Sequence, residues 1–137
     1  MVRPEIIRKK LNKLDEYLVI LGKAQRYSYD EFLSNPEYYG SVERFLHLAI
    51  ESVTDIGNHL VAELNMGRIE WYSDIPRLLA ENEYLSQELA DKWIRMIGFR
   101  NTLVHEYIDI DRRIVFDILQ NNLADLVQLK KVFAQFL

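Results

Sequence analysis

The sequence predicts an all-α fold, a bundle of four to five helices within a single domain that spans residues 1–137. Apolar residues recur at i, i+3, i+4 and i+7 over most of the chain, and almost no segment alternates apolar and polar residues as a strand does. A chain of 137 residues is long enough to bury one core and too short for two good ones. The sequence contains no internal repeat, low-complexity tract or linker, so one compact bundle is the simplest fold.

The composition sets limits on function and location. Apolar residues make up 49% of the chain and charged residues 28%, as in soluble globular proteins, and the absence of cysteine excludes disulfides and thiolate metal sites. No apolar run approaches a membrane span, and the N-terminus MVRPEIIRKK lacks the apolar core of a signal peptide, so we expect a cytoplasmic protein. The net charge of −4 argues against a generally basic nucleic-acid-binding surface but leaves a local basic cleft open.

The first helix is predicted to begin at Pro4, because proline suits the first turn of a helix. Its buried seam repeats at helical spacing and consists of Ile7, Leu11, Leu14, Leu18 and Leu21. A basic run lies mostly off this seam and consists of Arg8, Lys9, Lys10 and Lys13. A solvated helix face is the ordinary interpretation of such a run.

The segment from Gln25 to Ser41 follows a looser pattern. Asn35-Pro36 is a turn signal, and residues 30–33 are expected to form one helical turn. Four tyrosines gather here: Tyr27, Tyr29, Tyr38 and Tyr39. Tyrosine rings can stack on nucleic-acid bases, but covering the end of a bundle is the commoner role, because their large ring area favours burial.

A second long helix is predicted from Val42 to Met66. Its apolar stripe consists of Val42, Phe45, Leu46, Ala49, Val53, Ile56, Leu60 and Leu64. Gly57 within this helix suggests that another backbone approaches closely. Asp55 and His59 lie four residues apart beside the stripe, so the carboxylate can hold the imidazole. Such a pair is more often an ordinary polar contact than a catalytic dyad.

Three shorter segments complete the predicted bundle. Asp74 is a possible cap for a short helix that buries Ile75, Leu78 and Leu79, and Ser86 is a good cap for the helix after it. Gly98 in that helix suggests tight packing. Asp111 can cap the last helix, whose buried residues are Val115, Ile118, Leu119, Leu126, Leu129, Phe133 and Phe136.

The stretch from Arg100 to Tyr107 holds the densest set of chemically capable residues. It continues an apolar stripe that includes Leu89, Trp93 and Met96, and this spacing places Arg100, Asn101 and His105 on the buried side of the helix. Asn101 and His105 lie four residues apart, so the amide can fix the orientation of the imidazole. Arg100 and His105 diverge by roughly 140° around an ideal helix. We therefore expect that the helix ends near His105 or that a second copy of the chain completes the site.

The remaining motifs narrow the chemistry. The three histidines show no zinc-binding spacing, and the glycines form neither a Walker loop nor a dinucleotide turn. Arginine and histidine together suit phosphodiester cleavage by a ribose 2′-hydroxyl, because histidine can move the proton and arginine can stabilise the developing phosphorane. The structural alternatives are a buried Arg100 bonded to carbonyls or to an acid such as Asp55, and a Tyr107 that closes a helix end.

These residues also resemble a known family. The motif resembles the signature of HEPN-domain ribonucleases, in particular the HepT-like toxins of MNT/HEPN toxin–antitoxin systems. It consists of Arg100-Asn101, four residues between Arg100 and His105, and Tyr107 two positions after His105. The segments DIGNHLVAE and MIGFRNTLVHEYIDID are similar to that family as well, and the resemblance covers most of residues 42–126.

The resemblance implies one HEPN (HepT-like) domain over residues 1–137, with an up-and-down helical bundle that forms a homodimer. Arg100 and His105 would be the catalytic pair of a metal-independent endoribonuclease toxin of a type VII toxin–antitoxin system, in a cleft between two copies. Asn101 would support the pair, and Asp55 and His59 would line the same cleft.

The resemblance also implies partners and regulation. A cognate MNT-type nucleotidyltransferase antitoxin would attach AMP to Tyr107, which would fill the cleft and repel RNA. The chain itself would need no cofactor, the partner would use ATP, and the substrate would be tRNA or mRNA. The alternative function is a non-catalytic helical subunit that binds nucleotide or presents substrate to a nucleotidyltransferase, which suits the acidic net charge.

Overall fold

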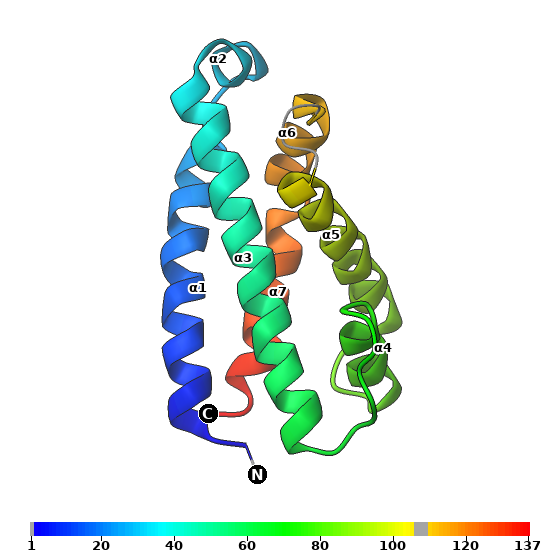
Figure 1. Ribbon diagram of the computed structural model, residues 1–137. Coiled ribbons are helices and arrows are strands. Elements are labelled where there is room, and N and C mark those ends of the chain that lie inside the picture. The colour runs from blue at the N-terminus through cyan, green and yellow to red at the C-terminus, as the bar shows by residue number, and fades with distance from the viewer. Residues whose placement is uncertain (1, 106–109) are drawn as a thin grey trace.

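The computed structural model describes residues 2–105 and 110–137, and all the elements in this part are helices. They are α1 (Pro4–Ala24), α2 (Tyr29–Ser34), α3 (Pro36–Glu63), α4 (Asp74–Glu81), α5 (Gln87–His105), α6 (Arg112–Asn121) and α7 (Leu123–Ala134). Figure 1 shows the long helices running alternately up and down, with α2 and α6 at one end. The predicted all-α bundle is confirmed, although the described part of the chain contains seven helices rather than four to five. None of these helices has the length and apolar character needed to cross a membrane.

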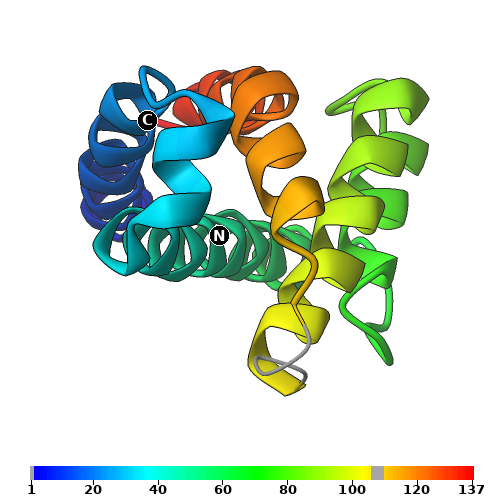
Figure 2. The same ribbon diagram turned by 90° about the horizontal axis from the view of Figure 1, so that it is seen from above.

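The core lies between α1, α3, α5 and α7. The predicted α1 seam is buried throughout, and α1 packs against α3 and α7 while α5 packs against α3 and α4. Seen from above, α4 and α5 form the side of the bundle away from α1 (Figure 2). Trp93 of α5 is fully buried, and its indole N–H donates to the Thr54 hydroxyl of α3 at 3.2 Å. This contact fixes the middle of α5 on α3. The same helix, α3, carries Asp55 and His59.

The second long helix begins earlier than predicted. α3 starts at Pro36, six residues before Val42, because Asn35 is its N-cap: the Asn35 side chain accepts a hydrogen bond from the Glu37 backbone N–H at 2.9 Å. Asn35-Pro36 is therefore a helix start as well as the turn that the sequence indicated. The other end of α3 is Glu63, three residues before the predicted end.

The predicted last helix is two helices. The chain leaves helical geometry at Asn122, whose side-chain amide donates to the Asp125 carboxylate at 3.0 Å. The hydrogen bond satisfies a polar group at the break, and the apolar pattern continues across it. Val115 and Leu119 are buried on α6, and the buried residues of α7 include Leu126, Leu129 and Phe133, whereas Ile118 and Phe136 are half-buried.

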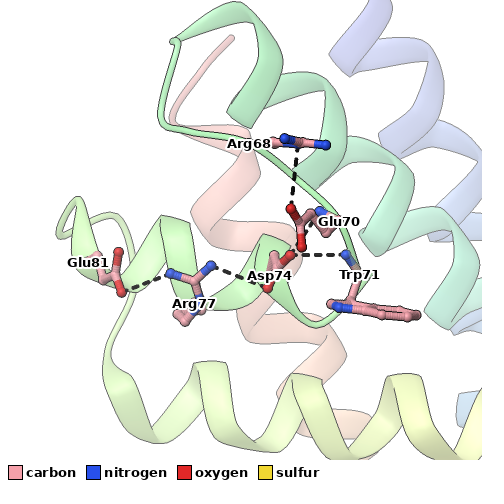
Figure 3. A network of polar contacts seen from close by, with 6 residues as sticks. All are labelled: Arg68, Glu70, Trp71, Asp74, Arg77 and Glu81. Carbon is pink, nitrogen blue, oxygen red and sulfur yellow. Dashed lines mark hydrogen bonds and ion pairs between the residues drawn. The ribbon is translucent and has the colours of Figure 1, made fainter.

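Two of the three predicted caps are confirmed. The Ser86 hydroxyl accepts from the Leu89 N–H at 3.1 Å, and Asp111 accepts from the Arg113 N–H at 3.0 Å. Asp74 acts differently, because it holds the loop before α4. One of its oxygens accepts from the backbone N–H groups of Glu70 and Trp71, at 2.9 and 3.0 Å (Figure 3). These two hydrogen bonds hold the pKa of the Asp74 carboxyl below its usual range.

The four tyrosines cover the end of the bundle, as predicted. Tyr27 stacks on Tyr38 with ring centroids 4.0 Å apart, and Tyr29 contacts Phe116 of α6 edge-on at 5.2 Å. The Arg112 guanidinium lies 3.9 Å from the centroid of the Tyr39 ring. All four tyrosines are half-buried, as expected for rings that close a hydrophobic core.

The two glycines singled out in the sequence differ in their surroundings. A methyl group at Gly57 would lie 2.6 Å from Ile75 and 2.7 Å from Trp93, so side chains, rather than the backbone that we expected, approach closely there. At Gly98 the expectation of tight packing was wrong, because nothing lies within 4 Å of an added methyl group. Gly98 is exposed on the outer face of α5.

Candidate active site

Arg100 lies near the C-terminal end of α5, with its side chain 23% exposed. One terminal nitrogen lies 3.8 Å from a carboxylate oxygen of Glu51 on α3, and the other donates to the Asn101 side-chain oxygen at 3.4 Å. The predicted position on the core-facing side of α5 is thus confirmed, but the guanidinium reaches solvent. Its acidic neighbour is Glu51, one helical turn before the Asp55 that the sequence suggested.

Asn101 and His105 are exposed, so the prediction that they lie on the buried side of α5 was wrong. The apolar stripe narrows in the last turns of α5, which have fewer neighbouring helices and extend past the bundle (Figure 2). In the described part of the chain no hydrogen bond joins the two side chains, and Asn101 accepts from Arg100 instead. Neither Arg100 nor His105 is sealed inside the protomer.

Asp55 and His59 do not form the predicted pair. Asp55 is exposed on α3 and forms an ion pair with Lys10 of α1. Among the described residues the buried Nε2 atom of His59 has no hydrogen-bond partner. The i, i+4 spacing was read correctly, but packing of α1 against α3 brings a lysine to Asp55, and lysine is the stronger competitor for a carboxylate because it remains charged.

The structure instead brings His47 and Glu51 of α3 to Arg100. The Nε2 atom of His47 lies 3.0 Å from the Glu51 oxygen that faces Arg100, and His47 Nδ1 is buried without a partner in the part of the chain described. Burial lowers the pKa of His47, and the cationic Arg100 and Arg44 lower it further, while Glu51 acts in the opposite direction. A neutral His47 can therefore direct its Nε2–H group at the Glu51 carboxylate, and the same carboxylate oxygen also faces Arg100.

Sequence reasoning missed His47 and Glu51, although their i, i+4 spacing on α3 was available. The same spacing occurs at Asp55 and His59 eight residues later, about two helical turns along α3, and that second pair was singled out from the sequence instead. Only the packing of α5 on α3 shows which pair faces Arg100.

Arg100 lines two clefts. One has a volume of about 540 Å³ between α3 and the end of α5, and its lining includes Arg44, His47, Glu51 and Val104. The other has a volume of about 910 Å³, lies along α1 and α3, and includes Glu51, Asp55 and Arg100. His105 lines neither cleft within the protomer, since it points to solvent from the end of α5.

Tyr107, the predicted modification site, lies outside the described residues. Within residues 2–105 and 110–137, no three His, Asp or Glu side chains lie together as a metal site requires. The metal-free mechanism stays a prediction, which a chelator can test.

Comparison with known proteins adds the family. The family model described as "Ribonuclease HepT-like" matches residues 7–133. The chain is 35% identical over 117 residues to a protein of Aphanizomenon flos-aquae named tRNA nuclease HepT, covering 84% of this chain and 78% of that protein. It is 34% identical over 83 residues to a Shewanella oneidensis protein named mRNA nuclease HepT, covering 61% and 62%.

Solved structures share the fold. A tri-AMPylated HEPN toxin of Shewanella oneidensis in complex with its MNT antitoxin superposes with a TM-score of 0.85 at 28% identity, covering 93% of this chain and 95% of that one. A toxin–antitoxin structure with AMP-PNP gives a TM-score of 0.83 at 27% identity, covering 93% and 97%. The family model, the relatives and the fold agree, and the chain belongs to the HepT-like ribonuclease family.

Proposed function

We propose that this protein is a metal-independent endoribonuclease toxin, in which Arg100 and His105 from two copies of the chain act on RNA in a shared cleft. The position of both residues in the last turns of α5 carries the proposal. The Arg100 guanidinium opens onto two clefts, and the His105 imidazole is exposed five residues later. Each of the two side chains is accessible to an RNA phosphate from solvent, without any rearrangement of the core.

The proposed chemistry needs a proton shuttle and a fixed positive charge. One His105 removes the proton of the ribose 2′-hydroxyl, whose oxygen attacks the adjacent phosphorus. The His105 of the second copy gives a proton to the departing 5′-oxygen. Arg100 stabilises the extra negative charge that the phosphorane carries in between. The products are a 2′,3′-cyclic phosphate and a 5′-hydroxyl, so no water enters the first step.

Two copies are needed because of the helix geometry. Arg100 and His105 diverge by roughly 140° around α5, so one straight helix cannot aim both at one phosphate. Arg100 faces α3 and His105 faces solvent, in agreement with that divergence. A second chain placed against the end of α5 would supply the missing direction.

An RNA cleavage assay in the presence of EDTA tests the proposal. The wild-type protein should cleave, His105→Ala should lower the rate by about 10²-fold or more, and Arg100→Ala should lower it by a similar factor. Arg95→Ala is the matched control, because Arg95 is exposed on the same helix and lines neither cleft. Cleavage that EDTA abolishes, or that survives His105→Ala, would overturn the mechanism. No cleavage at all would favour the alternative of a non-catalytic subunit that binds nucleotide or presents substrate to a nucleotidyltransferase.

We further propose an MNT-type nucleotidyltransferase as the antitoxin partner, which attaches AMP from ATP to Tyr107 while the chain itself uses no cofactor. The tri-AMPylated HEPN toxin in complex with MNT supports this proposal. Adenylate two residues after His105 would add negative charge where an RNA phosphate must approach. The mass of the protein produced together with its partner should rise by one or more AMP units. Tyr107→Phe should remove the increment, and Tyr84→Phe, at an exposed tyrosine elsewhere, should retain it.

A further inference from the structure

The basic charge of this acidic chain is concentrated at the start of α1. Residues 3–13 hold five of the 17 lysine and arginine residues but only one of the 21 acidic residues. This basic run was interpreted from the sequence as a solvated helix face, and the structure shows that three of its lysines border a cleft. Lys9, Lys10 and Lys13 all line the 910 Å³ cleft that also contains Arg100.

The three lysines of this cleft make few ion pairs with the described residues, and those pairs are exposed. Among the described residues, Lys9 makes no ion pair, and Lys13 makes an ion pair only with the exposed Glu16, at 3.4 Å. Lys10 pairs with the exposed Asp55. Exposed ion pairs contribute little free energy, so a polyanion can displace them. The remaining acids of the cleft are Glu5 and Glu51, and Glu51 already faces His47 and Arg100.

An aromatic side chain stands at the edge of the same cleft. Tyr72 lines it and is 58% exposed, and the neighbouring Trp71 is 72% exposed. Asp74 orders the loop that carries them, because it accepts from two loop N–H groups and forms an ion pair with Arg77 at 3.2 Å (Figure 3). The exposed rings are therefore presented by an ordered loop. Lysines along a groove with an exposed ring beside them are typical of surfaces that bind single-stranded nucleic acid.

We propose that this cleft, the lysine cleft, binds a single-stranded stretch of the RNA substrate next to the cleavage site. Lys9, Lys10 and Lys13 contact successive phosphates, Tyr72 stacks on a base, and the strand continues to Arg100. The inference rests on the proposed ribonuclease function for its substrate class and adds the residues that hold the strand. It also explains how an acidic protein binds RNA, since one local patch carries the favourable charge.

Binding of a short, fluorescein-labelled single-stranded RNA to the His105→Ala protein, measured by anisotropy over a range of salt, tests the inference without cleavage. Each phosphate contact contributes about 0.7 to the slope of log affinity against log salt, so replacing all three lysines by glutamine should reduce that slope by about 2. The matched control replaces Lys23, Arg26 and Lys131 by glutamine. These residues are exposed, lie outside the lysine cleft and carry the same total charge.

The tyrosine gives an independent measurement. Tyr72→Ala should weaken binding by about fivefold to a hundredfold, whereas Tyr72→Phe, which keeps the ring, should bind like the parent protein. If the triple lysine variant unfolds, the Lys9→Gln/Lys13→Gln pair, both exposed, replaces it, with an expected slope reduction of about 1.4.

Equal losses in the lysine-cleft and control variants, or an unchanged slope, would overturn the inference. The same measurements distinguish a failure of the lysine cleft from a failure of the proposed ribonuclease function. Wild-type cleavage with unaltered binding by the lysine variant would refute the cleft alone. Lysine-dependent binding without wild-type cleavage would support the cleft and refute the nuclease.

Discussion

At the scale of single residues, Glu51 decides how Arg100 is held. The same carboxylate oxygen lies 3.0 Å from His47 Nε2 and 3.8 Å from the Arg100 guanidinium. The shorter contact is within hydrogen-bond distance, and the longer one is an ion pair beyond it. Arg100 is thus oriented by charge but keeps donors free for a phosphate, which a tight bidentate pair with Glu51 would not allow.

Glu51→Gln should separate positioning from binding. Loss of the carboxylate charge leaves Arg100 less well oriented, so we expect kcat to fall by about tenfold. RNA binding should be unchanged or tighter, because one negative charge leaves the cleft. Single-turnover cleavage and anisotropy measure the two effects. Glu88→Gln is the control, since Glu88 is exposed at the far end of α5. Weaker binding with unchanged kcat would contradict the positioning role.

His47 makes stability depend on pH. Its pKa in the folded protein is lowered from the ordinary value of 6.5, first by burial and then by Arg100, with Arg44 acting in the same direction and Glu51 opposing. The unfolded chain therefore binds more protons than the folded chain as pH falls below about 6.5, and stability is lost in that window. The drop in Tm between about pH 7.5 and about pH 5.5 should be smaller for His47→Gln. An equal drop in both proteins would refute this origin of the pH dependence.

At the scale of the elements, a glycine in α3 and a glycine in α5 differ in the space around them. Gly57 lies where α3 meets the buried Trp93 and Ile75, and Gly98 lies on the open face of α5. A methyl group costs nothing in helix propensity and stabilises a helix by about 1 kcal/mol when there is room for it. The sequence pattern alone does not distinguish the two positions, because each is a lone glycine inside an apolar helix.

Gly57→Ala should lower the free energy of unfolding by about 1–3 kcal/mol, because overpacking against Trp93 outweighs the gain in propensity. Gly98→Ala should raise it by up to about 1 kcal/mol. Chemical denaturation of the two variants gives both values. A stabilised Gly57→Ala protein would mean that the contact of α3 with Trp93 is looser than the structure shows.

At the scale of the whole molecule, the end of α5 is the part of the proposed site that one protomer would leave incomplete. His105 is exposed and lines no cleft in the described chain, while Arg100 lies between two clefts. The homodimer that we propose would place a second α5 end at this position.

Mixing Arg100→Ala and His105→Ala proteins should restore a small part of the cleavage activity that each lacks alone. Each mixed dimer keeps one arginine and one of the two histidines, so one of the two proton transfers is still catalysed. Co-expression, followed by isolation of the mixed dimer and an RNA cleavage assay with EDTA, measures the recovery. A chain that sediments as a monomer of 16.3 kDa while it cleaves RNA would contradict the shared site.

Much of the fold could be predicted because helical periodicity is local. The α1 seam, the short α4 and the caps at Ser86 and Asp111 follow from residues within one or two turns of each other. The predicted helix boundaries were wrong where a polar side chain can take either of two local roles. Asn35 starts α3 rather than only making a turn, and Asn122 divides the last helix. The candidate pair, Arg100 and His105, was found from its motif and spacing, but its neighbours His47 and Glu51 were not.

The sequence by itself determined that the chain forms helices, which faces of them are apolar, and that Arg100 and His105 occupy the last turns of one helix. Only the tertiary structure decided that Glu51 rather than Asp55 faces Arg100, that His105 is exposed, and that the α1 lysines share a cleft with Arg100. The physical reason is range. Helix periodicity is set by neighbours three or four residues apart, whereas a cleft depends on how distant helices pack and on which charges that packing brings within a few ångströms.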